Sequence, residues 1–75
     1  MITDINHILI FKTNILTEAD KECIQKTLDT FDTIQQWTVD LQDTDRVLRI
    51  VSESLTPEQV ISVIESIGFD CSELA

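Results

Sequence analysis

The chain contains an internal repeat of one pattern of residues. When residues 8–20 are aligned with residues 47–59, hydrophobic and hydroxyl-bearing residues coincide at an offset of 39 positions. The coinciding pairs are Leu9 with Leu48, Phe11 with Ile50, Thr13 with Ser52, Leu16 with Leu55, Thr17 with Thr56, Ile24 with Val63 and Leu28 with Ile67. Each half reads as a strand, a helix and a second strand, because its apolar residues suit first an extended segment and then a helix. Two such halves predict a small split strand-helix-strand domain of the α+β class.

Four segments are predicted to be strands, at residues 7–13, 34–41, 46–53 and 69–73. The second alternates with a period of two and puts Trp37, Val39 and Leu41 on its inward side. In the third, Leu48 and Ile50 are expected to face inward. The polar residues 42–45 between these two strands predict a turn, so the strands should form a hairpin.

Two helices are predicted from their capping signals, over residues 18–31 and from residue 57 to about residue 67. Thr17 stands three residues before Asp20, and Thr56 stands three residues before Gln59, which is the spacing of a capping box. Gly68, the only glycine, follows the second helix at the place where a residue that tolerates positive φ is favoured.

The chain is strongly acidic, with 14 Asp and Glu against 5 Lys and Arg and a net charge of −9. Nucleic acid and anionic lipid would repel it, so we expect neither as a partner, and any charged partner is expected to be basic. The apolar run at residues 8–11 is too short for a signal core or a membrane span. We therefore expect a cytoplasmic protein with one domain, residues 1–75, whose core covers about residues 7–72.

The two cysteines lie far apart in the sequence and have no metal-type spacing. In a cytosolic protein they are expected to be free thiols. Cys23 is predicted to be a half-buried helix residue, and Cys71 to pack on the last strand.

Other groups that carry chemistry are sparse. His7 with Asp4 offers only one imidazole and one acid for zinc, and Asp40, Asp43 and Asp45 lack the glycine and closing glutamate of a calcium loop. The chain has a single His and a single Gly, so neither a nucleophile–His pair nor a glycine-rich phosphate loop is indicated. We expect no enzyme activity.

Four short motifs resemble those of heavy-metal-associated domains. They are Trp-Thr-Val-Asp-Leu at 37–41, Val-Leu-Arg-Ile at 47–50, Leu-Thr-Pro-Glu-Gln-Val-Ile at 55–61 and Ile-Gly-Phe-Asp at 67–70. The resemblance covers about residues 7–72 and is strongest in the second half. It implies a ferredoxin-like βαββαβ sandwich, with a four-stranded antiparallel sheet and two helices on one face.

The family's metal site is missing from this chain. Members that bind Cu(I) carry Met-x-Cys-x-x-Cys between the first strand and the first helix, whereas residues 12–20 here contain no Cys, His or Met. Whether the two cysteines are aligned with Asn14 and Thr17 or with Thr17 and Asp20, oxygen and amide groups stand there. Such hard donors do not replace thiolates on Cu(I). We expect no bound metal, with a weaker copper or zinc site built from Asn14, Asp20 and Cys23 as the alternative.

The sheet face opposite the helices is the candidate interaction surface. It is predicted to carry Ile8, Ile10, Val47 and Val51, ringed by Lys12, Arg49, Thr38 and Gln36. A large exposed apolar patch is uncommon on a soluble monomer and indicates an interaction site unless other side chains cover it. Either the long side chains of Arg49 and Lys12 cover it, or it binds another protein or a second copy of this chain. The sequence therefore predicts a non-catalytic domain that acts as a protein-interaction or self-associating module, and the metal-handling role remains the alternative.

Overall fold

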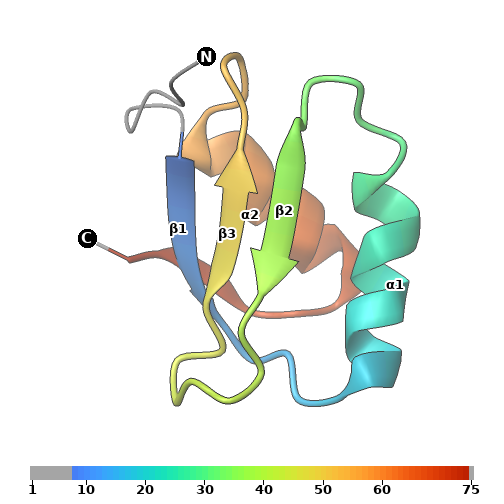
Figure 1. Ribbon diagram of the computed structural model, residues 1–75, viewed down its shortest axis with the longest axis vertical. Helices are drawn as coiled ribbons and strands as arrows, with labels where there is room; N and C mark the ends of the chain where they lie inside the picture. Colours follow the sequence, from blue (N-terminus) through green and yellow to red (C-terminus); the bar gives the residue numbers. More distant parts are fainter. Residues whose placement is uncertain (1–7, 75) are drawn as a thin grey trace.

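The computed structural model describes residues 8–74 and has six elements (Figure 1). They are β1 (Ile8–Thr13), α1 (Glu18–Leu28), β2 (Gln36–Val39), β3 (Leu48–Val51), α2 (Pro57–Ile67) and β4 (Cys71–Glu73). This order confirms the predicted βαββαβ arrangement. His7 and Asp4 lie outside the described residues.

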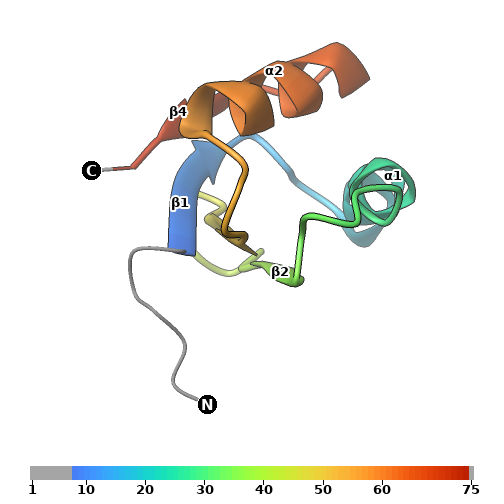
Figure 2. The same cartoon turned by 90° about the horizontal axis from the view of Figure 1, so that it is seen from above.

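The strands form one sheet in the order β2-β3-β1-β4, and each neighbouring pair is antiparallel. β1 and β3 are thus the central strands. Seen from above, α1 and α2 lie on the same side of the sheet (Figure 2). The predicted ferredoxin-like sandwich with two helices on one face is confirmed.

The regular elements are shorter than predicted at several ends. α1 ends at Leu28 because the next turn tightens, with the Thr30 N–H bonded to Thr27 and the Phe31 N–H bonded to Leu28. β3 begins at Leu48 because Arg46 has a φ of 47°, a left-handed value that interrupts an extended strand. The hairpin of β2 and β3 therefore has fewer strand residues than the alternating pattern indicated.

The core lies between the sheet and the two helices. Its fully buried large side chains are Phe11, Ile15, Ile24, Leu48, Ile50 and Ile64. In the register of the sheet, Trp37 lies opposite Ile50 and Val39 lies opposite Leu48. Residues directly opposite one another share a face, so the predicted inward positions of Trp37 and Val39 are confirmed.

The capping signals are formed as predicted. Thr17 accepts a hydrogen bond from the Asp20 N–H, Thr56 accepts one from the Gln59 N–H, and both capping boxes are complete. Gly68 ends α2 with a φ of 110°, which is the left-handed conformation that glycine adopts without strain.

The matched residues Thr13 and Ser52 also have matching roles. Both are buried, with 7% and 3% of their surface exposed. Thr13 Oγ1 accepts the Ile15 N–H at 3.3 Å, and Ser52 Oγ accepts the N–H of Ser54, the counterpart of Ile15 in the repeat, at 3.4 Å. The internal repeat is thus a repeat of the local hydrogen bonds that turn each strand towards its helix.

Candidate functional site

The connection between β1 and α1 is where the resemblance would put a metal site. Its Asp20 carboxylate is engaged by the backbone, since Oδ2 accepts the Leu16 N–H at 3.1 Å and the Thr17 N–H at 3.3 Å. Thr17 Oγ1 in turn accepts the Asp20 N–H at 3.1 Å. These side chains hold the start of the helix, which is what a capping box does.

Asn14 is engaged by a different part of the chain. Its Oδ1 accepts the Asp70 N–H at 2.8 Å, and its Nδ2 donates to Asp70 Oδ2 at 3.3 Å. Asn14 therefore joins the end of β1 to the segment before β4. The amide oxygen that would have to bind an ion already accepts a backbone hydrogen bond.

Cys23 is exposed and free, so the expectation that it is half-buried is wrong. The reason is its place on α1: the next residue, Ile24, takes the inward position and is 0% exposed. Within residues 8–74, no group of three or more His, Cys, Asp and Glu side chains is placed to hold a metal ion.

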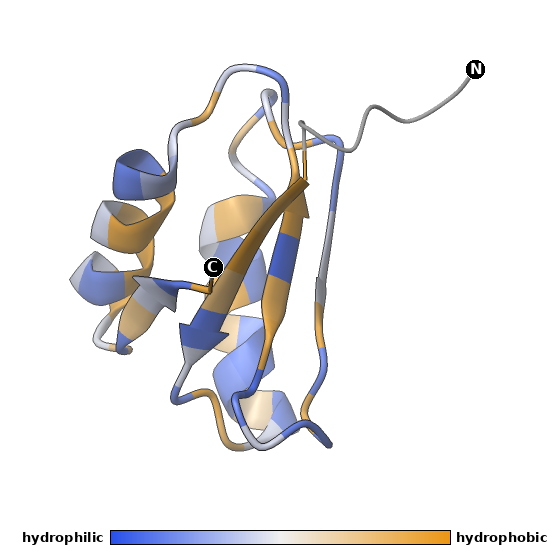
Figure 3. Ribbon diagram, turned by 90° about the vertical axis from the view of Figure 1, so that its left-hand side faces the viewer, coloured by the Kyte–Doolittle hydropathy of each residue, from blue (hydrophilic) through white to orange (hydrophobic). Residues whose placement is uncertain are grey.

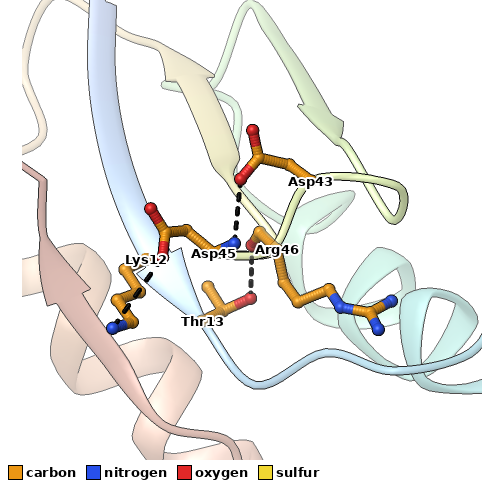
Figure 4. A network of polar contacts seen from close by, with 5 residues as sticks. All are labelled: Lys12, Thr13, Asp43, Asp45 and Arg46. Carbon is orange, nitrogen blue, oxygen red and sulfur yellow. Dashed lines mark hydrogen bonds and ion pairs between the residues drawn. The ribbon is translucent and has the colours of Figure 1, made fainter.

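The three acids between β2 and β3 organise the turn. Asp40 Oδ1 accepts the Gln42 N–H at 3.0 Å, and Asp43 Oδ1 accepts the Asp45 N–H at 2.8 Å. Asp45 forms an ion pair with Lys12 at 3.8 Å (Figure 4). Asp40 and Asp43 thus form the Asx-type turns that short acidic side chains favour, whereas Asp45 joins the turn to β1.

Thr13 and Arg46 join this turn to the start of α1 (Figure 4). Thr13 Oγ1 donates to the Arg46 carbonyl at 2.6 Å, and the Thr13 N–H donates to the Asp45 carbonyl at 3.0 Å. Arg46 Nη1 donates to the carbonyls of Leu41, at 2.6 Å, and Leu16, at 3.4 Å. Sequence reasoning missed this network, although the match of Thr13 with Ser52 was a signal for its hydroxyl. No local pattern marks Arg46.

The side of the sheet away from the helices is the second candidate site, and we call it the open face. It is formed by Ile8, Ile10, Lys12, Gln36, Thr38, Arg49, Val51, Ser72 and Leu74. In the register, Ile8 lies opposite Val51, and Ile10 lies opposite Arg49. The central strands are hydrophobic along most of their length (Figure 3). The predicted interaction residues on these strands are therefore brought together, with one exception.

The exception is Val47, which was expected on this patch but is only 5% exposed. It precedes β3, its carbonyl accepts the Asp40 N–H, and its neighbour Arg46 has the left-handed backbone. Val47 thus belongs to the base of the hairpin turn and offers almost no surface to a partner. Leu74 was missed by sequence reasoning: its N–H donates to the Ile10 carbonyl, and it is 37% exposed.

A shallow hollow of about 230 Å³ lies on the open face, lined by Ile8, Gln36, Trp37, Thr38, Arg49 and Val51. This volume is below the ~300–1,000 Å³ of typical small-molecule sites. Arg49 is exposed, and within residues 8–74 no carboxylate forms an ion pair with it. The hollow suits one apolar side chain better than a substrate or a cofactor.

Cys71 is buried in the core, at 7% exposure, as predicted for a packing residue. Burial raises the pKa of its thiol from 9.0 to about 11, and the negative charge of Glu65 adds to the rise. Both effects disfavour the thiolate. Cys71 is thus the inert kind of cysteine, since the thiolate is the nucleophile and the metal ligand.

The raised pKa of Cys71 predicts a loss of stability at high pH. Between pH 9 and pH 11 the unfolded chain releases this proton and the folded chain retains it, so the free energy of unfolding should fall as the pH rises through this window. Urea unfolding of the wild type and of Cys71→Ala, below pH 9 and near pH 11, measures the effect. The fall should be larger in the wild type, and equal falls would contradict the assignment.

The described part of the chain contains no helix that could cross a membrane, because α1 and α2 have 11 residues each and a span needs about 20.

Several solved structures share this fold. The apo form of the heavy-metal-associated domain of a copper chaperone for superoxide dismutase matches with a TM-score of 0.78 and 18% identity, over 91% of this chain and 66% of that chain. The chain thus spans slightly less than two thirds of that protein. The copper(I)-loaded first domain of the human copper chaperone for SOD1 matches with a TM-score of 0.76 and 18% identity, over 88% of this chain and 89% of that one.

The yeast copper transporter domain Ccc2a matches with a TM-score of 0.77 and 18% identity, over 91% of this chain and 94% of that chain. No family model and no curated protein matches the sequence. At this level of identity the similarity concerns the fold. The chain has the fold of heavy-metal-associated domains, as the sequence motifs predicted.

Proposed function

We propose that this chain is a heavy-metal-associated domain that has lost the family's soft-metal site and acts by binding protein through its open face. It is non-catalytic and cytoplasmic in this proposal. The observation that carries the proposal is the pairing of Ile8 with Val51 and of Ile10 with Arg49 on the side of the sheet opposite α1 and α2. Apolar side chains gathered on one exposed face are typical of protein-interaction sites.

The β1–α1 connection supports the loss of the metal site. Asn14 Oδ1 and Asp20 Oδ2 accept backbone hydrogen bonds, and Cys23 is a free, exposed thiol on α1. A soft ion such as Cu(I) requires thiolate or thioether ligands, and one thiol is below the number such sites use. Metal carriage by Asn14, Asp20 and Cys23 is therefore the weaker candidate.

Protein binding is also in keeping with what similar domains do. One structure that matches this chain, with a TM-score of 0.78 and 18% identity, is a solution structure of an Atx1–Cu(I)–Ccc2a complex. That complex contains copper as well as two proteins. We propose that in this chain only the protein contact has been retained.

An anaerobic titration of the reduced protein tests the loss of the metal site. Cu(I) and Zn(II) are added against a competing chelator, and native mass spectrometry records the bound ions and the oligomeric state. We expect no ion to be held beyond the competitor, and the same result for Cys23→Ser. One tightly held ion per chain that is lost in Cys23→Ser would restore the metal-carrier role.

Selection from a displayed library of random short peptides tests the open face. The wild type should enrich a set of peptides, and Ile10→Glu should lose them because a charge in the middle of the patch cannot be buried without a large cost. Thr38→Glu, at an exposed position of the same face, serves as a second variant if Ile10→Glu fails to fold. Gln25→Glu adds the same charge on exposed α1 and should keep the enriched set. Equal enrichment by all variants would contradict the proposal.

A further inference from the structure

We propose that the occupant of the open face is an acidic segment of another protein, in which an apolar side chain enters the hollow and a neighbouring carboxylate pairs with Arg49. This inference rests on the proposed function and specifies its partner. It also separates the local charge of the open face from the net charge of the chain, which is −9.

Arg49 stands in the middle of the face. It lies on the central strand β3, with Thr38 opposite it on one side and Ile10 opposite it on the other. It is exposed, and among residues 8–74 no carboxylate forms an ion pair with it. A guanidinium group carries a rigid fork of donors that matches a carboxylate with two parallel hydrogen bonds. Within the described residues Arg49 thus has no carboxylate partner, and an incoming carboxylate can pair with it.

The four described strands place no acid on the open face. Among the residues of the four described strands, Glu73 is the single acid, and it lies opposite Phe11 in the register, on the side that faces the helices. Lys12 adds a second cation to the open face, and its partner Asp45 belongs to the turn before β3. At physiological salt, exposed charges further apart than about 8 Å are largely screened. A bound segment therefore responds to Arg49 more than to the acids on the helices, whereas Asp45 offsets the charge of Lys12.

The apolar part of the contact lies next to the cation. Ile8 and Val51 are directly opposite each other and line the hollow together with Arg49. When an apolar side chain of the partner occupies this hollow, a carboxylate on the next residue of the partner can therefore reach the guanidinium group of Arg49. This pairing of neighbours gives the chemistry of the partner: an aliphatic or aromatic residue beside Asp or Glu.

A second copy of this chain fits the face less well. Pairing two open faces about a two-fold axis brings the same patch of each copy together, so the cations of one face meet those of the other. The two chains also repel each other, because each has a net charge of −9. Both terms disfavour a second copy, and the cations of the open face favour a partner that is acidic at the contact.

The peptide selection described above tests the inference when the enriched sequences are read for composition. The wild type is expected to enrich Asp or Glu beside apolar residues. Arg49→Glu should lose these peptides and enrich Lys and Arg in their place, whereas Lys26→Glu, which makes the same charge change on exposed α1, should behave as the wild type. A synthetic peptide from the wild-type set should bind Arg49→Glu about tenfold more weakly or worse, and its affinity should fall with added salt.

Other outcomes overturn the inference in distinguishable ways. Enriched peptides with no excess of acids that are still lost in Ile10→Glu would refute the acidic partner and leave the open face as a binding surface. Peptides that are insensitive to both Arg49→Glu and Ile10→Glu, or no enrichment at all, would refute the proposed function as well. A dimer in native mass spectra that Ile10→Glu dissociates would identify a second copy as the occupant.

Discussion

Replacing Phe11 with alanine is expected to lower the free energy of unfolding by about 3–5 kcal/mol. Phe11 is 0% exposed on central strand β1, opposite Leu48 and against the core formed with the helices. The loss has two parts: the free energy that burial of the ring contributed, and the cost of the cavity that remains. A domain of this size has a total stability of roughly 4–11 kcal/mol, at 0.05–0.15 kcal/mol per residue, so the variant should be close to unfolding.

Urea unfolding, followed by the fluorescence of the single Trp37 and by circular dichroism, measures this loss. Ile10→Ala is the matched control, because it truncates the adjacent residue of the same strand on the open face. It should cost clearly less than Phe11→Ala. Equal costs would mean that both faces of the sheet are covered to the same extent, and would contradict the assignment of the open face.

Replacing Thr13 with valine is expected to lower the free energy of unfolding by about 2 kcal/mol or more, although valine is more hydrophobic and has nearly the same shape. The Thr13 hydroxyl donates to the Arg46 carbonyl at 2.6 Å and accepts the Ile15 N–H at 3.3 Å. Thr13 is 7% exposed, so both backbone groups lose a partner in a place that water reaches poorly. A backbone group left unsatisfied in this way costs about 1–3 kcal/mol.

Thr13→Ser is the control for this prediction, since it keeps the hydroxyl and loses only a methyl group. Urea unfolding should rank serine above valine in stability. The valine variant should also loosen the connection of the β2–β3 turn to β1, which amide hydrogen exchange at Asp45 and Arg46 would detect as faster exchange. If valine is as stable as serine, the hydroxyl has no structural role and the network in Figure 4 is not what holds this turn.

Most of the fold could be predicted because its signals are local. The capping boxes of Thr17 and Thr56 join residues three positions apart, and Gly68 is required by the positive φ at its own position. The faces of β1 and β3 follow from a period of two within each strand. The ends of the strands and helices were predicted less accurately. The left-handed backbone of Arg46 shortens β3, for example, and no pattern in the neighbouring residues indicates it.

The candidate sites could be predicted only in part. The sequence alone shows that the β1–α1 connection contains no thiols. The hydrogen bonds that join Asn14 to Asp70, 56 residues away, could be seen only in the folded chain. Val47 fitted the alternating pattern of the open face and is nevertheless buried, while Leu74 was missed because its place beside Ile10 depends on the β1–β4 register. Alternation indicates the direction of a side chain, and the contacts of other segments decide whether it is exposed.

The sequence by itself determined the order of the elements, the capped starts of both helices and the absence of thiols at residues 12–20. These features depend on residues that are near one another along the chain. Only the tertiary structure decided the charge of the open face. It sets Arg49 between Thr38 and Ile10 and leaves it without a carboxylate partner among the described residues, in a chain whose net charge is −9. Net charge is a sum over all residues, whereas the field that a partner meets depends on which strands are neighbours, and the packing of the whole chain fixes that.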